Sequence, residues 1–315
     1  RQNRLRKRVQ RKVRLWNYKF INKKMDQSLA VLFALIAMIL WGFEEFFLKE
    51  AIAGIKSITT YIINTLTGVV VDLAIVFYLF DFGISKISGF DLFLVVATTL
   101  FAFLGYFSFY KALEKQKLSL ISSLDESWIV VSVLIALLFF GEKLGMVHVG
   151  AIVAVLVGAF LISAVRLSHF SHLKFIKGSG YELLAALFIG FTIPIEKVLV
   201  TNVGEANTLF YLTLFVIPVV FLAKALMKQK WIKPSWKMTR VSVLSGITDS
   251  SAFIFYLFAI KSADISVISP IVASSVVVTV ILARIFLGEK MTTRQITGAS
   301  IILAGVFVLS YTFGF

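Results

Sequence analysis

The sequence predicts an all-α polytopic membrane protein whose ten transmembrane helices form two inverted repeats of five helices each. Three observations support this fold class: 59% of the 315 residues are hydrophobic and only 16% are charged, apolar runs of membrane-spanning length recur along the chain, and the second half repeats the first. Soluble domains average about 45–50% apolar and about 25% charged residues, so this chain has too little polar surface to enclose a soluble core.

Apolar runs divide the chain into predicted spans and connections. A transmembrane helix needs about 20 apolar residues. Ten such runs are present, at Gln27–Leu48, Ile58–Phe80, Leu92–Ala112, Leu118–Phe140, Met146–Val165, Tyr181–Val200, Thr208–Met227, Val241–Ile260, Ile265–Leu287 and Thr293–Phe313. We therefore predict a basic N-terminal segment (1–26), a first five-helix repeat (27–165), a polar linker (166–180) and a second five-helix repeat (181–315).

The internal repeat is clearest between Leu118–Lys143 and Ile265–Lys290, which both end in Gly-Glu-Lys at an offset of 147 residues. The first spans of the two halves match more faintly at an offset of 148, where Gly42 pairs with Gly190 and Lys49 with Lys197. Self-similarity on this scale indicates two copies of one structural unit. Because five is an odd number, the second copy enters the membrane in the opposite direction, and a binding site is expected near the midplane between the halves.

The orientation of the chain is predicted differently by its two groups of basic residues. Residues 1–24 hold eleven Lys and Arg and no acid, which favours a cytoplasmic N-terminus facing anionic lipid. The Lys and Arg of the connecting loops lie mostly on the side opposite the N-terminus, which favours the reverse orientation. The chain starts with Arg and has Met25 just before the first span, so residues 1–24 are also interpreted as an upstream reading error or the edge of a fragment.

Several classes of function are disfavoured by the sequence. The chain has no cysteine and three histidines that form no convincing cluster, so neither a metal site nor a cofactor is expected. It carries no Gly-rich nucleotide motif, which argues against transport driven by ATP, and no nucleophile–base constellation, which argues against an enzyme. The basic segment has no recognisable nucleic-acid-binding fold, so nucleic acid is not an expected partner.

Acidic residues inside predicted spans are the best candidates for function, because ionisable groups are costly in a membrane. Asp125 and Glu126 lie about two turns into the fourth span, where the second repeat has Val272 and Ala273. This asymmetry favours binding of substrate or proton, and the alternative is that the span begins later and leaves both acids at the membrane interface.

The first and sixth spans carry further acids. Glu44 is the better cavity candidate of its pair, since Glu45 has Lys49 four residues on and could form a salt bridge near the interface. Glu196 follows Pro194, which could free a backbone carbonyl for a ligand. The alternative for Glu196 is neutralisation of a basic neighbour.

Asp249 in the eighth span shares a helical face with Ser245 and Tyr256, a combination that could bind a polar solute. The alternative is packing against the ninth span. Aromatic residues that could form a cavity wall are Tyr106, Tyr110 and Trp128, although most of the many aromatic residues are expected in the core or against lipid.

Small residues are expected to bring two other spans together. Gly150, Ala154 and Gly158 form a stripe in the fifth span, and Gly298 and Gly305 form another in the tenth. Such stripes allow close helix packing, for which contacts within the chain are favoured over a dimer face.

The Trp41-Gly42 pair, the following Lys49, the duplicated Gly-Glu-Lys turns and the ten apolar runs resemble the EamA type of the drug/metabolite transporter superfamily. The resemblance covers residues 25–315. It implies a ten-helix inverted-repeat carrier, commonly an exporter of small organic solutes such as amino acids, with both termini in the cytoplasm. It also implies a central cavity surrounded by the first, third, fourth, sixth, eighth and ninth spans.

We therefore expect a secondary active transporter of small organic metabolites in the cell (plasma) membrane, working by alternating access, with coupling to protons as one mode. Small solute and membrane lipid are the expected partners. The alternative is a flippase for a lipid or lipid-linked intermediate, with Arg284 and Lys224 as headgroup contacts. The sequence does not specify substrate, coupling ion or oligomeric state.

Overall fold

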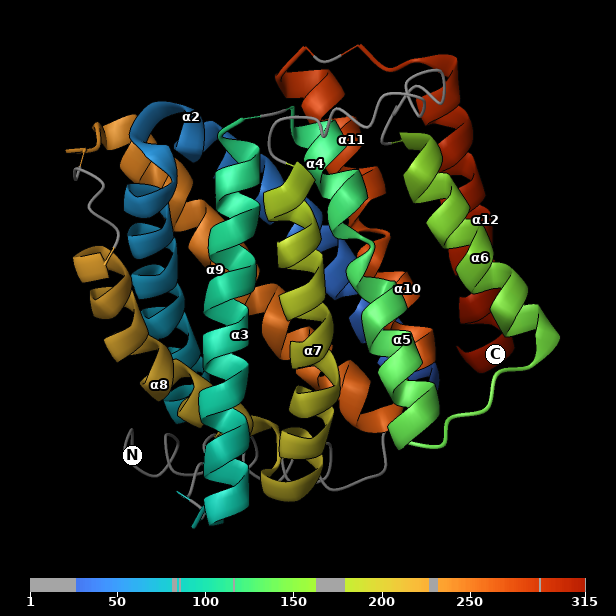
Figure 1. Cartoon of the computed structure of the whole chain (residues 1–315), viewed down its shortest axis with the longest axis horizontal. Helices are drawn as coiled ribbons and strands as arrows, with labels where there is room; N and C mark the ends of the chain where they lie inside the picture. The colour runs from blue at the N-terminus through green and yellow to red at the C-terminus, as the bar shows by residue number, and fades with distance from the viewer. Residues whose placement is uncertain are drawn as a thin grey trace, which may run out of the picture.

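The computed structural model describes residues 27–80, 84, 86–115, 117–162, 179–226, 232–288 and 290–314. The predicted basic segment 1–26 lies outside the described residues, and so does the predicted linker 166–180 except for its last two residues. Throughout the described part the regular structure is α-helical, as predicted (Figure 1). The helices are α2 (Gln27–Leu79), α3 (Gly89–Leu113), α4 (Leu118–Asp125), α5 (Trp128–Phe139), α6 (Met146–Ile162), α7 (Ser179–Val203), α8 (Glu205–Leu226), α9 (Trp236–Ser262), α10 (Ile265–Ala273), α11 (Ser275–Phe286) and α12 (Thr293–Gly314).

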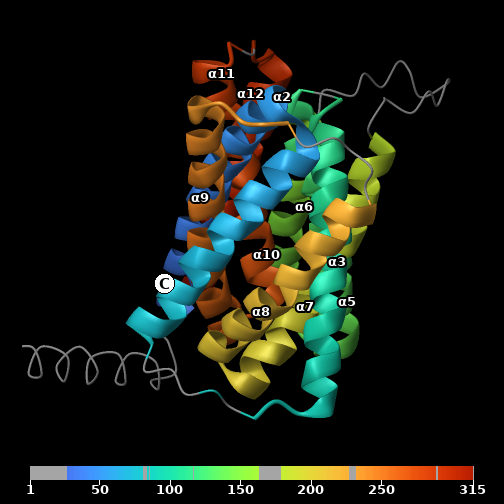
Figure 2. The ribbon, with the colours of Figure 1, turned by 90° about the vertical axis from the view of Figure 1, so that its left-hand side faces the viewer.

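Helix α2 contains both the first and the second predicted spans. It is 53 residues long, but Lys56 interrupts it with φ 67° and ψ 165°, so the chain turns back at this residue. A straight helix of this length would extend ~80 Å, far beyond the ~30 Å hydrocarbon core of a bilayer. The two segments of α2 therefore form two crossings, and Figure 2 shows the second segment slanting alongside α9.

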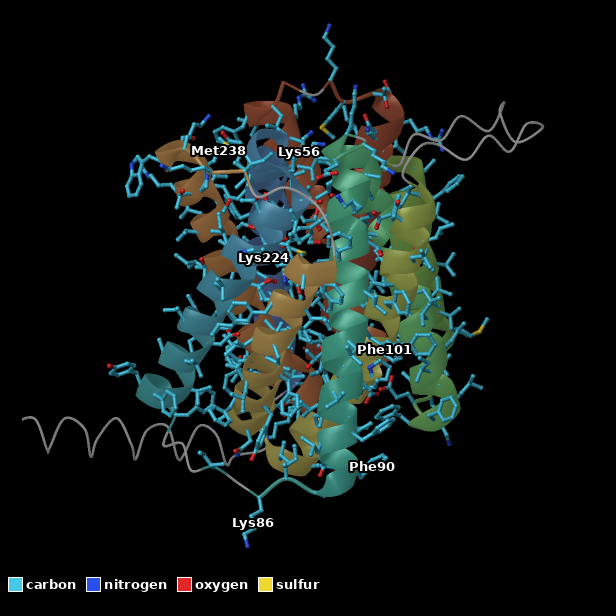
Figure 3. The ribbon with its side chains drawn as sticks, turned by 60° about the vertical axis from the view of Figure 1, so that its left-hand side comes forward. Lys56, Lys86, Phe90, Phe101, Lys224 and Met238 are labelled. Carbon is cyan, nitrogen blue, oxygen red and sulfur yellow. The ribbon has the colours of Figure 1, made fainter. Side chains whose placement is uncertain are left out.

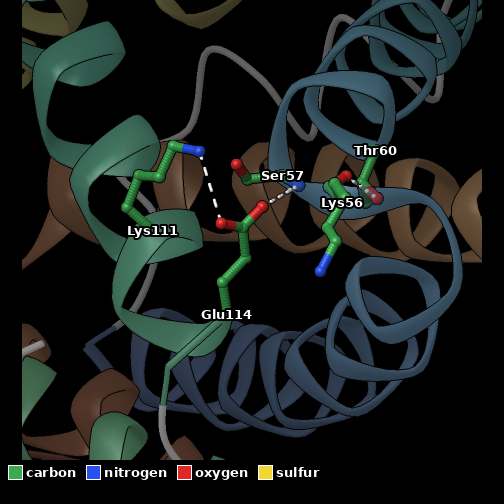
Figure 4. Close-up of polar contacts among 5 residues, drawn as sticks. All are labelled: Lys56, Ser57, Thr60, Lys111 and Glu114. Atoms are coloured by element: carbon green, nitrogen blue, oxygen red, sulfur yellow. Dashed lines mark hydrogen bonds and ion pairs between the residues drawn. The ribbon is translucent and has the colours of Figure 1, made fainter. Parts of the chain in front are cut away.

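The turn at Lys56 is held by the end of α3 (Figure 4). The backbone N–H of Ser57, the first residue after the turn, donates a hydrogen bond of 2.6 Å to Glu114 Oε1. The other oxygen of Glu114 lies 3.3 Å from Lys111 Nζ. Glu114 thus satisfies a backbone donor that the interruption leaves without a helical partner.

The fourth and ninth predicted spans are each divided into two helices rather than continuous. The break falls at Glu126-Ser127 in the first repeat and at Ser274 in the second, positions that match at the 147-residue offset. In the second repeat Pro270 removes a backbone donor, and Ser274 Oγ donates to the Pro270 carbonyl at 2.8 Å. Broken helices of this kind occur where a membrane protein lines a cavity.

Seven helical segments of the described part are long and apolar enough to cross a membrane, with α10 and α11 counted together as Ile265–Phe286, while α5 and α6 are shorter apolar helices. Ten crossings as a count therefore stay a prediction. Lys86 and Phe90 lie at one end of the bundle, and Lys56 and Met238 lie at the other (Figure 3). We refer to these as the Lys86 end and the Lys56 end. Large apolar side chains are exposed around the bundle, whereas every residue of α10 is buried, so this first part of the ninth span lies at the centre.

Contacts between the two repeats occur in reciprocal pairs. A Cβ atom on Gly42 would lie 2.5 Å from Val278 Cβ, and one on Gly190 would lie 2.5 Å from Val131 Cβ. Gly190 is the repeat partner of Gly42, and Val278 is the repeat partner of Val131, so the second contact is the first with the halves exchanged. This exchange is the signature of a two-fold relation between the repeats.

The two repeats also share a lysine contact. Lys49 Nζ donates to the carbonyl of Leu113 at the end of α3. Its repeat partner Lys197 donates to the carbonyl of Ile260, the partner of Leu113, and to that of Ala263 at 2.7 Å. The first contact lies near the Lys56 end and the second near the Lys86 end. The reason is that the first segment of α2, which carries Lys49, and α7, which carries Lys197, run in opposite directions (Figure 1). Each lysine satisfies carbonyls that a helix C-terminus leaves free.

The glycine stripes pack α6 against α12. A Cβ on Gly158 would lie 2.6 Å from the Gly298 carbonyl oxygen, and one on Gly305 would lie 2.9 Å from that of Ala151. These small residues therefore make contacts within the chain, as predicted. Gly150 has open space where its Cβ would be, so it is not part of this contact.

Candidate functional site

A central cavity of about 220 Å³ lies between the two repeats. The first, third, fourth, sixth, eighth and ninth spans all contribute to its wall, and so do α8 and the second segment of α2. The two broken spans meet there at the same depth, since Asp125 and Glu126 come from one break and Val272 and Ala273 from the matching one. All the candidate residues named from the sequence line this cavity: Glu44, Tyr106, Tyr110, Asp125, Glu126, Trp128, Glu196, Asp249 and Tyr256.

Glu44 and Asp249 form one polar region of the wall, where α2 packs against α9. Trp41 Nε1 donates to Asp249 Oδ1 at 3.0 Å. Ser245 Oγ donates to Glu44 Oε1 at 3.2 Å and itself accepts from Asn64 Nδ2 at 2.8 Å. The helical stripe predicted from Ser245 to Tyr256 therefore faces the cavity side of α9 and contacts the first span.

Glu126 and Asp125 form a second polar region at the break between α4 and α5. Glu126 is buried, and its Oε1 accepts from Ser275 Oγ across the repeat boundary at 3.2 Å. Glu45 lies close to both acids. Glu45 is only 6% exposed and lines the cavity, so it belongs to this polar region, while the salt bridge near the interface stays a prediction.

Glu196 and Tyr256 form the third polar region, on α7 and α9. Both are buried, and the tyrosine hydroxyl faces the carboxylate. Helix α7 continues through Pro194, so the proline does not break it. The Trp41 ring lies 5.4 Å from the Tyr256 ring between centroids, which joins this region to the one around Asp249.

Aromatic side chains separate the polar regions. Tyr106 has Asp249, Glu196, Glu44 and Asp125 as its charged neighbours, which places it among all three regions. Tyr110 stacks edge-on against Tyr61, with centroids 5.7 Å apart. The wall therefore alternates carboxylates with ring faces.

Sequence reasoning missed three acids. Glu45 was assigned to the interface because Lys49 follows it by one helical turn. Asp72 was not among the candidates named from the sequence, yet it lines the cavity and accepts from Thr213 Oγ1 at 3.0 Å. Glu182 lies at the start of α7 beside Asp125 and is fully buried, although it is not part of the cavity wall. It was not selected from the sequence because it lies in the first turn of a predicted span, where acids usually face water.

Arg284 and Lys224, the headgroup contacts of the flippase alternative, are both exposed and lie outside the cavity wall. No group of three or more His, Cys, Asp or Glu side chains in the described part is arranged to hold a metal ion. The cavity chemistry is therefore that of carboxylates, hydroxyls and aromatic rings.

Comparison with solved structures shows the fold. A crystal structure described only as that of a protein superimposes with a TM-score of 0.66, covering 90% of this chain and 97% of that chain. The two sequences are 16% identical, so the likeness concerns the fold alone.

Comparison of sequences shows the family. A curated relative, the "Uncharacterized transporter in cobO 3'region" of Sinorhizobium sp., is 29% identical over 133 residues, which are 41% of this chain and 94% of that protein. The profile of the EamA-like transporter family matches residues 28–164 and matches again at residues 176–311, which shows the two-repeat architecture. Both matches name transport as the role, and transport proteins are generally not enzymes. The chain is an integral membrane protein that belongs to the EamA-like transporter family.

Proposed function

We propose that this chain is a secondary active transporter that exports small organic metabolites, a class that includes amino acids, by alternating access to the central cavity. The observation that carries the proposal is the cavity itself. Its wall is formed by both repeats, whose reciprocal contacts indicate a two-fold relation. A wall shared in this way can open to either side of the membrane when one repeat moves against the other.

Coupling to protons is supported by the acids around the break between α4 and α5. Asp125 lies between the cavity and Glu182, which is buried at the start of α7 near the Lys56 end. The carboxyl group of Glu182 faces that of Asp125. Asp125 and Glu182 could pass a proton between that end of the bundle and the substrate site.

The test is uptake into liposomes driven by a pH gradient. Amino acids, amines and sugars are supplied to the parent protein and to the variants Asp125→Asn, Glu126→Gln and Asp249→Asn. We expect the parent to accumulate at least one solute class and each variant to lose most of that uptake. Full transport by all three variants would exclude these carboxylates from the mechanism.

We also propose that the protein lies in the plasma membrane with its N-terminus in the cytoplasm, as the basic segment and the family resemblance suggest. In this orientation the Lys86 end is cytoplasmic and the Lys56 end is external. The loop charges favour the reverse orientation, and labelling of single cysteines distinguishes the two.

A further inference from the structure

Within the part of the chain that the structure describes, all the charged residues of the cavity wall are acidic. Seven carboxylates line the cavity, and none of the described lining residues is Lys, Arg or His. The seven are Glu44, Glu45, Asp72, Asp125, Glu126, Glu196 and Asp249. Negative charge removed from water in this way has to be offset by bound cations or by protons.

Four of these carboxylates have an oxygen without a hydrogen-bond partner in the described residues: Glu45, Asp72, Asp125 and Glu196. Glu45 and Glu196 are 6% and 5% exposed, and the Oε2 atom of each lacks a hydrogen-bond partner in the described residues. Both residues line the cavity. Acceptors are thus available to a bound molecule in more than one polar region of the wall, including that of Glu45 and Asp125 and that of Glu196.

The carboxylates are spread along the membrane normal rather than gathered at one point. Asp125 is seven residues from the start of α4 at the Lys56 end, and Glu196 is seven residues from the end of α7 at the Lys86 end. At about 1.5 Å per residue each lies ~10 Å from its own end of the bundle. Glu182, which lies beside Asp125, precedes Glu196 by 14 residues on α7, so Asp125 and Glu196 are separated by roughly 10–20 Å along the normal. No three of the described carboxylates are arranged for a metal ion, so the separation favours a ligand with spaced positive groups.

The surfaces between the acids suit an alkyl chain and ammonium groups. Tyr106 lies among acids of all three polar regions, and Tyr110, Trp128 and Phe253 add further ring faces to the wall. Aromatic faces attract ammonium groups, and their edges and the neighbouring aliphatic side chains accommodate methylene groups. A zwitterionic amino acid would instead bring its own carboxylate into a wall that already carries seven.

From these observations we infer that the cavity binds linear organic cations with two or more ammonium groups, of the diamine and polyamine class, in preference to zwitterionic amino acids. This inference rests on the proposed transport function and names the substrate class of the same site. One ammonium group binds near Glu126 and Glu45, another binds near Glu196, and the alkyl chain passes Tyr106.

The test measures dissociation constants for the purified full chain by isothermal titration calorimetry. The probes are putrescine, linear diamines of increasing length, spermidine, butylamine, leucine and lysine. We expect an optimum in diamine length, with the best diamine binding at least about tenfold more tightly than butylamine, as each added charge-assisted contact is worth about this much or more. We also expect the diamine Kd to increase as the pH falls, since protons and ammonium groups compete for the same carboxylates.

Variants locate the site. Glu126→Gln and Glu196→Gln are each expected to raise the diamine Kd roughly tenfold to hundredfold. Glu50→Gln is the control and should leave the Kd unchanged, because Glu50 pairs with Lys237 at 2.7 Å outside the cavity.

Liposome uptake of the same solutes distinguishes a failure of the diamine inference from a failure of the proposed transport function. Uptake of leucine without binding or uptake of any diamine would overturn the inference and leave the transport function standing. Diamine binding that is unaffected by both variants would also overturn it. Uptake of no solute from any class would contradict the proposed function itself.

Discussion

Glu114 joins the end of α3 to the turn within α2, outside the predicted membrane-spanning segments. Burial raises the pKa of Glu114, but the hydrogen bonds from Ser57 and the charge of Lys111 outweigh it, so that the pKa lies below its usual value. A carboxyl whose pKa is lowered by folding contributes stability above its unfolded pKa of about 4.3, and this contribution is lost as the pH falls through the folded pKa.

We therefore predict that Glu114→Gln lowers the free energy of unfolding by about 1 kcal/mol at neutral pH, comparable to the loss of a helix cap. The difference from the parent should shrink as the pH falls below about 4, where the parent carboxyl is itself protonated. Thermal unfolding in detergent across this pH range is the measurement. Lys111→Met keeps the Ser57 hydrogen bond and should cost less, and a Glu114→Gln effect that does not change with pH would contradict the assignment.

At the scale of single residues, the sequence was informative about properties that depend only on neighbouring residues in the chain. A charge inside a hydrophobic run is costly wherever it faces, so Glu44, Asp125, Glu126, Glu196 and Asp249 could be selected without knowing the fold, and the structure places all of them on the cavity wall. Their roles in binding stay predictions. Glu45 and Glu182 were missed because their surroundings depend on helices far away in the sequence.

At the scale of helices, Gly158 and Gly150 offer a matched comparison on α6. A Cβ at position 158 would meet the backbone carbonyl of Gly298 at 2.6 Å, which cannot move without separating α6 from α12, whereas a Cβ at position 150 meets nothing within 4 Å. We predict that Gly158→Ala destabilises the protein by about 1–3 kcal/mol. Gly150→Ala should be neutral or stabilise slightly, because Ala favours the helix.

Melting temperatures of the two variants, measured in the same detergent, check this prediction. Equal melting temperatures would show that the close approach of α6 and α12 is not needed for stability. The sequence indicated small-residue stripes on both helices but could not say which glycines meet, since that depends on how the helices are rotated about their axes.

The divided spans were also beyond sequence reasoning. Pro270 marks the region of the second break, but the first break at Glu126-Ser127 has no proline or glycine. Its position follows from the fold, where the two broken spans meet at the cavity. Matching the repeats could have transferred the break from one half to the other.

For the whole molecule, the repeat at an offset of 147 residues was enough to predict the two-repeat architecture, because two copies of one sequence fold alike. Orientation is different, because it depends on the charges that flank the spans, and these disagree. We propose a cytoplasmic N-terminus and predict the labelling pattern of single cysteines, which the chain permits because it contains none.

Lys86→Cys places a thiol in an exposed loop at the Lys86 end of the bundle (Figure 3), and Lys233→Cys places one in the exposed loop next to Ile232, whose N–H donates to Thr59 near the Lys56 end. In intact cells a membrane-impermeant maleimide should label the cysteine at position 233 and spare the one at position 86 until the membrane is permeabilised. The opposite pattern would reverse the proposed orientation without affecting the fold.

Alternating access requires the central cavity to open to each side of the membrane in turn. Thr98 lines the cavity and is 1% exposed, so Thr98→Cys is a reporter within it. The decisive measurement is its labelling by an impermeant maleimide in right-side-out and inside-out vesicles, with and without a transported solute. We expect labelling from both sides, with the solute increasing it on one side as it decreases on the other. Labelling from neither side, or from one side under every condition, would contradict alternating access.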